Sequence, residues 1–192
     1  MTDRLLVDGM CGGIVAYCRM CGHDTLYAGD RDLEDDARLL DVAAAEDRTV
    51  VTRDVDLAGR SERAILLESR DTDEQLRTLH DRGVDLTLPD EPRRCGRCNG
   101  PIERVPETET TDTPPYAPDP NEVAVWACRD CGQHFWKGSH WDRVRRTLET
   151  VRSRESRDER GLEGNKNDHT GDEISPIGDQ SEPAGDENRS DQ

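Results

Sequence analysis

Long apolar runs are missing from this chain of 192 residues. No stretch approaches the roughly 18 uncharged residues that a helix needs to cross a bilayer. The first residues, MTDRLLVDG, also lack the basic and apolar leader that directs export. These two absences predict a protein of the cytoplasm with no membrane segment.

Lysine and aromatic residues are scarce as well. Only Lys137 and Lys166 are lysines among 26 basic residues, and aromatic residues make up 4% of the chain. Acidic residues number 43, so the formal net charge is -17. This composition resembles that of proteins from salt-loving cells. An acidic surface normally repels nucleic acid, but in molar salt the Debye length is about 3 Å, so local geometry decides whether RNA binds.

Cysteine is present seven times, an odd number that favours reduced thiols and metal binding over a disulfide framework. The strongest pattern is CGRC at 95–98 followed by CRDC at 128–131. Each CxxC motif forms a knuckle that presents two thiolates to one tetrahedral Zn²⁺. Four thiolates leave no open coordination position, so the zinc is expected to be structural. The predicted ligands are Cys95, Cys98, Cys128 and Cys131.

The other three cysteines, Cys11, Cys18 and Cys21, lie in or beside a run with helical apolar spacing. We expect them to be small buried hydrophobic residues. Cys18 and Cys21 form a further CxxC, which leaves a second thiolate site open as the alternative.

Apolar runs alternate with amphipathic stretches in the first 88 residues. Strand-like runs occupy 5–8, 25–29, 49–52 and 64–68, and helical patterns occupy 13–21, 36–46 and 73–81. This alternation predicts an α/β domain over 1–88 with a mainly parallel sheet.

The remainder of the chain divides into two parts. Residues 89–94, PDEPRR, form a linker into a zinc ribbon that we place within 89–148, and five prolines in 106–121 predict a long exposed loop between the cysteine pairs. Residues 149–192 are expected to be a disordered acidic tail, because 161–192 contain nine acidic and two basic residues and few large apolar ones.

Four aspartates stand where the expected strands and helices meet. Asp8 follows the first strand, Asp36 begins a helix, and Asp54 and Asp56 follow the third strand. The carboxyl ends of parallel strands line one crevice, so these groups can converge there. Carboxylates that share a crevice repel one another unless a hard cation neutralises them, so we expect Mg²⁺ or Mn²⁺ and a phosphate-bearing substrate. A capping role for Asp35 or Asp36 is the competing interpretation.

The segment 134–146, HFWKGSHWDRVRR, reverses the acidic character of the chain and holds three of its seven aromatic residues. Aromatic faces interleaved with basic groups suit single-stranded RNA, because bases stack on such rings. The alternative, weighed equally, is that the tryptophans pack the ribbon against the first domain. The residues expected to contact RNA are Trp136, Lys137, His140, Trp141 and Arg143 in this segment, and Arg53 beside Asp54.

Several segments, in order, resemble the Mut-seven C-terminal ribonuclease family, which belongs to the PIN-like nucleases. They are RLLVDGM at 4–10, RMCGHDTLYAGD at 19–30, DDARLLDVAAAEDRTVVTRDVDL at 35–57, CGRCNGPI at 95–102 and FWKGSHWDRV at 135–144. The resemblance covers about 3–148 and implies a PIN-like three-layer fold, an appended zinc ribbon and an Mg²⁺ or Mn²⁺ site for RNA cleavage. It carries the metal-binding role to Asp8, Asp36, Asp54 and Asp56. The family typically has leucines where Cys11, Cys18 and Cys21 stand.

Taken together, the sequence predicts a metal-dependent endoribonuclease that cleaves single-stranded RNA with carboxylate-held Mg²⁺ or Mn²⁺ and an activated water. The main alternative is a non-catalytic RNA-binding adaptor built around the zinc ribbon. A phosphatase with Asp8 as the nucleophile is disfavoured, because that class usually has a second aspartate where Met10 stands.

Overall fold

The computed structural model describes residues 2–106 and 114–153. The segment 107–113 of the expected loop lies outside the described residues. So do residues 154–192, which make up most of the expected acidic tail.

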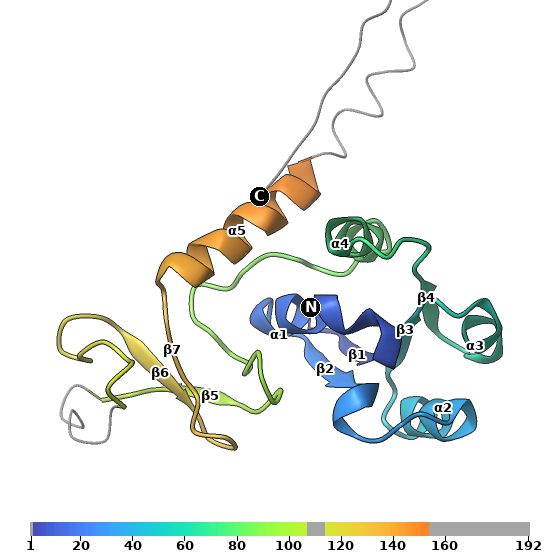
Figure 1. The fold of residues 1–192 in the computed structure, drawn as a ribbon, viewed down its shortest axis with the longest axis horizontal. Coiled ribbons are helices and arrows are strands. Elements are labelled where there is room, and N and C mark those ends of the chain that lie inside the picture. Colours follow the sequence, from blue (N-terminus) through green and yellow to red (C-terminus); the bar gives the residue numbers. More distant parts are fainter. Residues whose placement is uncertain (1, 107–113, 154–192) are drawn as a thin grey trace, which may run out of the picture.

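The N-terminal part is built on a four-stranded parallel sheet with the order β2-β1-β3-β4 (Figure 1). Its strands are β1 (Arg4–Val7), β2 (Asp24–Tyr27), β3 (Thr49–Thr52) and β4 (Ala64–Leu66). The last three residues of β1, Leu5, Leu6 and Val7, are all buried. Continuous burial along a strand means that both faces of the sheet are covered, as expected of a parallel sheet. The predicted α/β class is confirmed.

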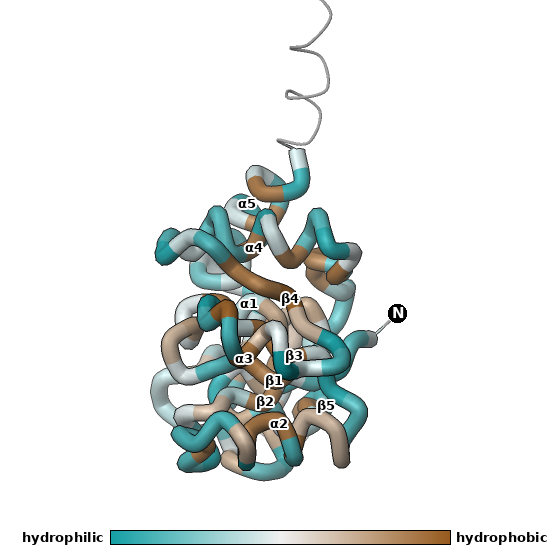
Figure 2. Tube along the Cα trace, turned by 90° about the vertical axis from the view of Figure 1, so that its right-hand side faces the viewer, coloured by the Kyte–Doolittle hydropathy of each residue, from teal (hydrophilic) through white to brown (hydrophobic). Residues whose placement is uncertain are grey.

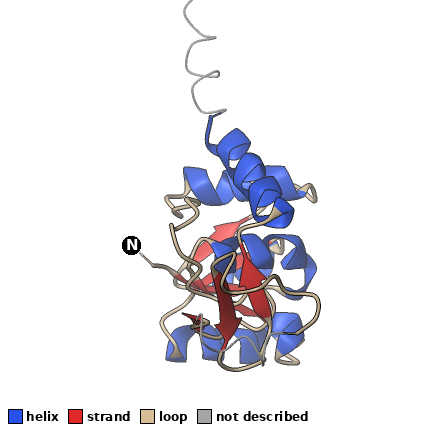
Figure 3. Cartoon of the chain, turned by 90° about the vertical axis from the view of Figure 1, so that its left-hand side faces the viewer, coloured by secondary structure: helices blue, strands red, loops and turns tan. Residues whose placement is uncertain are grey.

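Helices cover both faces of the sheet, so that the strands lie between two helical layers (Figure 3). These helices are α1 (Val15–Met20), preceded by the 3₁₀ helix η1 (Gly9–Ile14), α2 (Asp36–Ala45), α3 (Val55–Arg60) and α4 (Thr72–Asp81), with a short 3₁₀ turn η2 (Ala28–Asp30). Leu5 and Val51 pack in the core under α1 and α4, whereas Leu6 and Val50 pack in the core under α2 and α3. Figure 2 shows this apolar interior beneath hydrophilic outer turns.

The first helix differs from the expected span of 13–21, because it begins as a 3₁₀ helix at Gly9. Two glycines allow this segment to lie close to its neighbours. A Cβ at Gly12 would lie 2.9 Å from Tyr27 Oη, and one at Gly13 would lie 2.9 Å from Thr72 Oγ1. Gly22, with φ +93, follows the C-cap residue Cys21 and ends the helix.

The ribbon is a three-stranded antiparallel sheet of β5 (Ile102–Arg104), β6 (Val125–Cys128) and β7 (His134–Trp136). Helix α5 (Ser139–Ser153) follows it and returns to the N-terminal part (Figure 1). There Val144, Leu148 and Val151 are buried in the same core as the residues of α4. The helix continues past residue 148, where we had placed the start of the tail. None of the described helices is long and apolar enough to span a membrane.

A buried arginine, Arg19, joins α1 to the first cysteine knuckle. Its side chain is 3% exposed, and its Nη1 donates to the carbonyl oxygens of Arg97 at 2.7 Å and of Gly96 at 3.2 Å. Its Nε donates to the carbonyl of Thr25 at 3.0 Å, and its Nη2 pairs with Asp30 at 3.1 Å. The ribbon is therefore held to the α/β domain by charge-assisted hydrogen bonds.

A second set of bonds converges on Asp24, the first residue of the edge strand β2. Asn99 of the knuckle donates to Asp24 Oδ1 at 2.7 Å and accepts from the backbone nitrogen of Thr25 at 3.0 Å. Arg48, which is buried, donates to both oxygens of Asp24 at 3.1 and 3.2 Å. Burial acts to raise the pKa of Asp24, but the hydrogen bonds from Arg48 and Asn99 outweigh it and hold that pKa below its usual value.

Replacing Asp24 tests how much it contributes to the stability of the fold. Asp24→Ala removes one of the two carboxylates that pair with the Arg48 side chain, which is 5% exposed, and it also removes the acceptor of Asn99, so we expect a loss of about 3 kcal/mol in the free energy of unfolding. Glu103→Ala is the matched control, because its ion pair with Arg129 is exposed and should contribute less than about 1 kcal/mol. Urea unfolding of the two variants measures both values.

The pH dependence gives the second readout. The pKa of Asp24 is lowered in the folded state, so its contribution is present above the pKa of the unfolded chain and is lost as pH falls through the folded value. The stability gap between wild type and Asp24→Ala should therefore shrink below about pH 4. Equal losses for the two variants at neutral pH would contradict the central role of Asp24.

Candidate functional site

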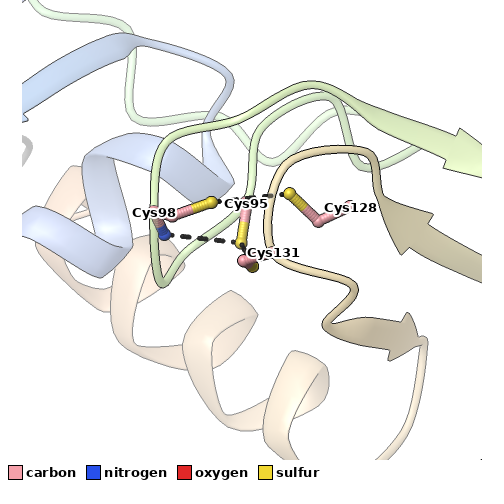
Figure 4. A group of neighbouring side chains, drawn as sticks. All are labelled: Cys95, Cys98, Cys128 and Cys131. Atoms are coloured by element: carbon pink, nitrogen blue, oxygen red, sulfur yellow. Dashed lines mark hydrogen bonds between the residues drawn. The ribbon is translucent and has the colours of Figure 1, made fainter.

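The four predicted zinc ligands lie together at the junction of two loops. Cys95 and Cys98 come from the turn before β5, Cys128 ends β6, and Cys131 lies in the turn before β7. Figure 4 shows their sulfur atoms turned toward one another.

Their spacing fits a tetrahedral ion. The Sγ atoms of Cys95 and Cys131 are 3.6 Å apart, those of Cys98 and Cys128 are 3.5 Å apart, and all four lie within 4.8 Å of one another. Zinc–sulfur bonds of about 2.3 Å place the corners of a tetrahedron about 3.8 Å apart. The donor set and its dimensions are therefore those of a structural zinc site.

The backbone of the knuckles explains why these residues suit the site. Asn99 and Gly132 have positive φ values of 68 and 70, which close the turns after each cysteine pair. A Cβ at Gly100 would lie 2.9 Å from Cys128 Sγ, so only glycine fits there. Burial raises the pKa of Cys95 to about 12, so a thiolate at this position needs a cation beside it, and a zinc ion would supply that charge.

The remaining cysteines belong to the α/β core. Cys11 is 1% exposed and Cys18 is fully buried, and both contribute to the core under α1. Burial raises the pKa of Cys11 to about 11 and that of Cys21 to about 12. The expectation of small buried hydrophobic residues is confirmed for Cys11 and Cys18, whereas Cys21 is partly buried against the same core. No second thiolate cluster occurs within residues 2–106 and 114–153.

Two of the four candidate carboxylates are joined through Thr52 at the carboxyl ends of β1 and β3. Thr52 Oγ1 donates to Asp8 Oδ2 at 2.7 Å and accepts from the backbone nitrogen of Asp54 at 3.0 Å. Asp54 also caps α3, because its Oδ1 accepts from the backbone nitrogens of Asp56 and Leu57. These contacts leave Asp8 Oδ1 and Asp54 Oδ2 without a protein partner among the described residues.

The other two carboxylates are less constrained. Asp36 lies in the first turn of α2, where its Oδ2 accepts from Arg60 of α3 at 3.0 Å, and Asp56 is exposed in the first turn of α3. Asp35, rather than Asp36, caps α2. Within the described residues only the four zinc-type cysteines form a group of ligand dimensions, so the structure does not bring the four aspartates that close together.

Exposed apolar and basic side chains surround this acidic edge, which we define as Asp8, Thr52 and Asp54. Met10 is 51% exposed and Val55 is 67% exposed. The Nη2 atom of Arg53 lies 3.7 Å from Met10 Sδ, and Arg53 forms no ion pair within the described part of the chain. Sequence reasoning did not identify Thr52 as a linking residue. Its position two residues before Asp54, at the end of a buried strand, is the signal that could have marked it.

The basic-aromatic segment divides into buried and open parts. Trp141 is 5% exposed and packs inside, as the alternative interpretation expects. Trp136 is half-buried, and His140 and Arg143 are exposed. Lys137 Nζ lies 5.8 Å from the centre of the Trp141 ring.

The cysteine cluster predicts the metal content. Replacing Cys95 and Cys128 together with serine should remove the zinc and lower the melting temperature, because the binding energy of a structural zinc is folding energy. Elemental analysis of the purified protein measures this. Cys21→Ser, outside the cluster, is the matched control and should keep one zinc per chain. Wild-type protein without zinc, or a double variant that retains it, would contradict the site.

Comparison with known proteins identifies a family whose model spans both the acidic edge and the cysteine cluster. Searches of curated proteins and of solved structures found no significant match. A family model described as Mut7-C RNAse domain matches residues 3–148, which include the acidic edge, all four zinc-type cysteines and most of α5. The resemblance expected from the sequence is confirmed, and the chain belongs to the Mut7-C RNase domain family.

Proposed function

We propose that this chain is a metal-dependent endoribonuclease that cleaves single-stranded RNA at its acidic edge. Membership in the family implies a ribonuclease and an RNA substrate. The observation that carries the finer proposal is Thr52, whose hydroxyl is bonded both to the carboxylate of Asp8 and to the backbone of Asp54. One hydroxyl thus holds the carboxylate of Asp8 and the backbone of Asp54 at the same end of two neighbouring strands.

Each residue of the edge has a defined part in this proposal. Asp8 and Asp54 each keep one oxygen for a divalent cation, and carboxylate oxygens are the ligands that Mg²⁺ and Mn²⁺ prefer. Asp36 and Asp56 complete the site directly or through water. When bound, the cation supplies charge neutralisation and a more acidic water. Arg53 binds a phosphate oxygen of the RNA, because its guanidinium has no carboxylate partner among the described residues.

The ribbon side of the molecule holds the strand. Trp136, Lys137, His140 and Arg143 lie on β7, the turn after it and α5, and none of them is deeply buried. Their rings and cations bind bases and phosphates without sequence preference.

A second candidate, a non-catalytic RNA-binding adaptor, is favoured by a different observation. Asp54 has a structural use as the cap of α3, and Asp36 has one as the partner of Arg60. In that case the carboxylates stabilise helices and the ribbon alone carries the function.

The substitution Asp54→Asn separates the two. Asparagine caps a helix about as well as aspartate, so the fold should survive while metal-dependent cleavage falls by at least a hundredfold, on the order expected for loss of a group that stabilises charge in the transition state. Cleavage of labelled single-stranded RNA with Mn²⁺, and with chelator, measures it.

Asp71→Asn is the matched control. Asp71 caps α4 through the backbone nitrogens of Asp73 and Glu74, in the same manner as Asp54 caps α3, but it is not part of the proposed edge. It should cleave at the wild-type rate. Undiminished cleavage by Asp54→Asn would favour the adaptor, or a nuclease site elsewhere.

Metal binding at the edge should also raise the melting temperature. A ligand that binds only the folded state stabilises it by about 2.7 kcal/mol at a hundredfold excess over its dissociation constant. The increase with Mg²⁺ or Mn²⁺ should shrink in Asp8→Asn, because Asp8 provides one of the two unpartnered oxygens. Thermal unfolding at a series of millimolar Mg²⁺ or Mn²⁺ concentrations measures the increase. A wild-type melting temperature that does not change with metal concentration would count against a cation site.

A further inference from the structure

A cleft opens between the ribbon, helix α1 and helix α5. Its volume is about 230 Å³, below the about 300–1,000 Å³ of sites for drug-sized ligands. It therefore has room for one small group. The lining residues that carry the inference are Ala16, Met20, Gly96, Arg97, Trp136 and Trp141.

We propose that this cleft receives a single unpaired nucleobase of the RNA, with an adjacent phosphate beside Arg97. The inference rests on the proposed ribonuclease function and deepens it. The cleft would allow the protein to distinguish single-stranded from paired RNA, because only an unpaired base can leave the stack and enter the cleft.

The walls match the faces of a base. Phe135 and Trp136 come from β7 and are half-buried, so part of each ring remains available to a ligand. Met20 from α1 and Ile102 from β5 add apolar surface. Aromatic rings bind any base through its face, and a methionine sulfur adapts to a flat partner.

One wall also contains an unpaired hydrogen-bond donor. The indole nitrogen of Trp141 is buried and has no acceptor among the described residues. Buried tryptophan nitrogens usually find a partner. The carbonyl oxygens and ring nitrogens of a base are hydrogen-bond acceptors, so an inserted base could provide the acceptor that the Trp141 nitrogen lacks.

The rim carries a cation in an otherwise acidic protein. Arg97 is exposed and forms no ion pair with any described residue, although the chain has a formal net charge of -17. Its backbone carbonyl is fixed by Arg19 at 2.7 Å, so the position of the residue is set by the knuckle. We therefore expect a binding partner to provide an anion that pairs with Arg97. A phosphate next to an inserted base is such an anion.

Segments 107–113 and 154–192 contain no Phe, Tyr or Trp, and His169 is their one aromatic residue. These segments therefore offer no large aromatic side chain to fill the cleft.

The cleft and the acidic edge lie at opposite ends of one helical segment. Asp8 immediately precedes η1, and Met20 ends α1. Six residues of 3₁₀ helix, interrupted by a kink at Cys11, and six of α-helix span at most about 20 Å. A long strand can occupy both places, whereas we expect a trinucleotide to bind at the edge alone.

Filling the cleft tests the proposal. A Cβ at Gly96 would meet only Met20 Cγ, at 4.0 Å, so the side chain of Gly96→Leu enters the cleft without a backbone clash. Ala16→Leu fills it from the exposed face of α1 and serves as the second variant. Gly59→Leu on α3 is the matched control, because a Cβ there meets nothing within 4 Å.

Binding is measured without added Mg²⁺ or Mn²⁺, using a labelled oligouridine of about a dozen nucleotides and an abasic strand of equal length. Wild type and Gly59→Leu should prefer the oligouridine by at least about fivefold, the loss expected for one unstacked base. Gly96→Leu and Ala16→Leu should lose the part of this preference that the cleft supplies, so that their preference is at least about fivefold smaller than that of wild type. Filled variants that keep their zinc and melting temperature yet retain the preference would overturn the proposal, as would a wild type with no preference.

Cleavage of a trinucleotide with Mn²⁺ keeps the two proposals apart. If all cleft variants cleave it at the wild-type rate and Asp54→Asn does not, the proposed nuclease stands whatever the binding assay gives. If wild type cleaves no RNA but still prefers bases through the cleft, the nuclease proposal fails and base capture is retained.

Discussion

The contact of the first cysteine knuckle with the edge strand β2 is the constraint on which the rest of the structure depends. Arg19 and Asn99 satisfy backbone groups on both sides of this contact, and Asp24 gathers Arg48, Arg94 and Asn99 around one carboxylate. Buried charges of this kind stabilise a fold only when every partner is present. The ribbon is thus fixed to the sheet by buried polar groups, and these groups would be left without partners if the ribbon were removed.

This contact ties metal binding to the α/β domain. The carbonyl oxygens to which Arg19 donates belong to the CGRC turn, whose shape depends on four sulfur ligands meeting at one point. The cleft has Gly96 and Arg97 of the same turn in its wall. A structural zinc ion held by these cysteines would therefore influence both the docking of the ribbon and the surface that we expect to face RNA.

Much of this organisation could be predicted from the sequence, because apolar runs and CxxC spacing are local signals. All four parallel strands and the zinc ligands fall where they were expected. Helix α3 was missed, since VDLAGR is a single turn or two with no apolar repeat. The parts played by Arg19 and Thr52 could not be predicted either, because each depends on residues distant in the sequence. The proposed metal-binding role of the four aspartates stays a prediction.

Helix α5 changes how the chain is divided. Its Val144, Leu148 and Val151 complete a core begun by Leu76, Leu79 and Val84, so the last apolar layer of the first domain is encoded after the ribbon. During synthesis the apolar side of α4 that α5 covers must stay exposed until the ribbon has been made. In topological terms the ribbon is an insertion within one folding unit, and a fragment ending at residue 88 would be an unfinished core rather than a domain.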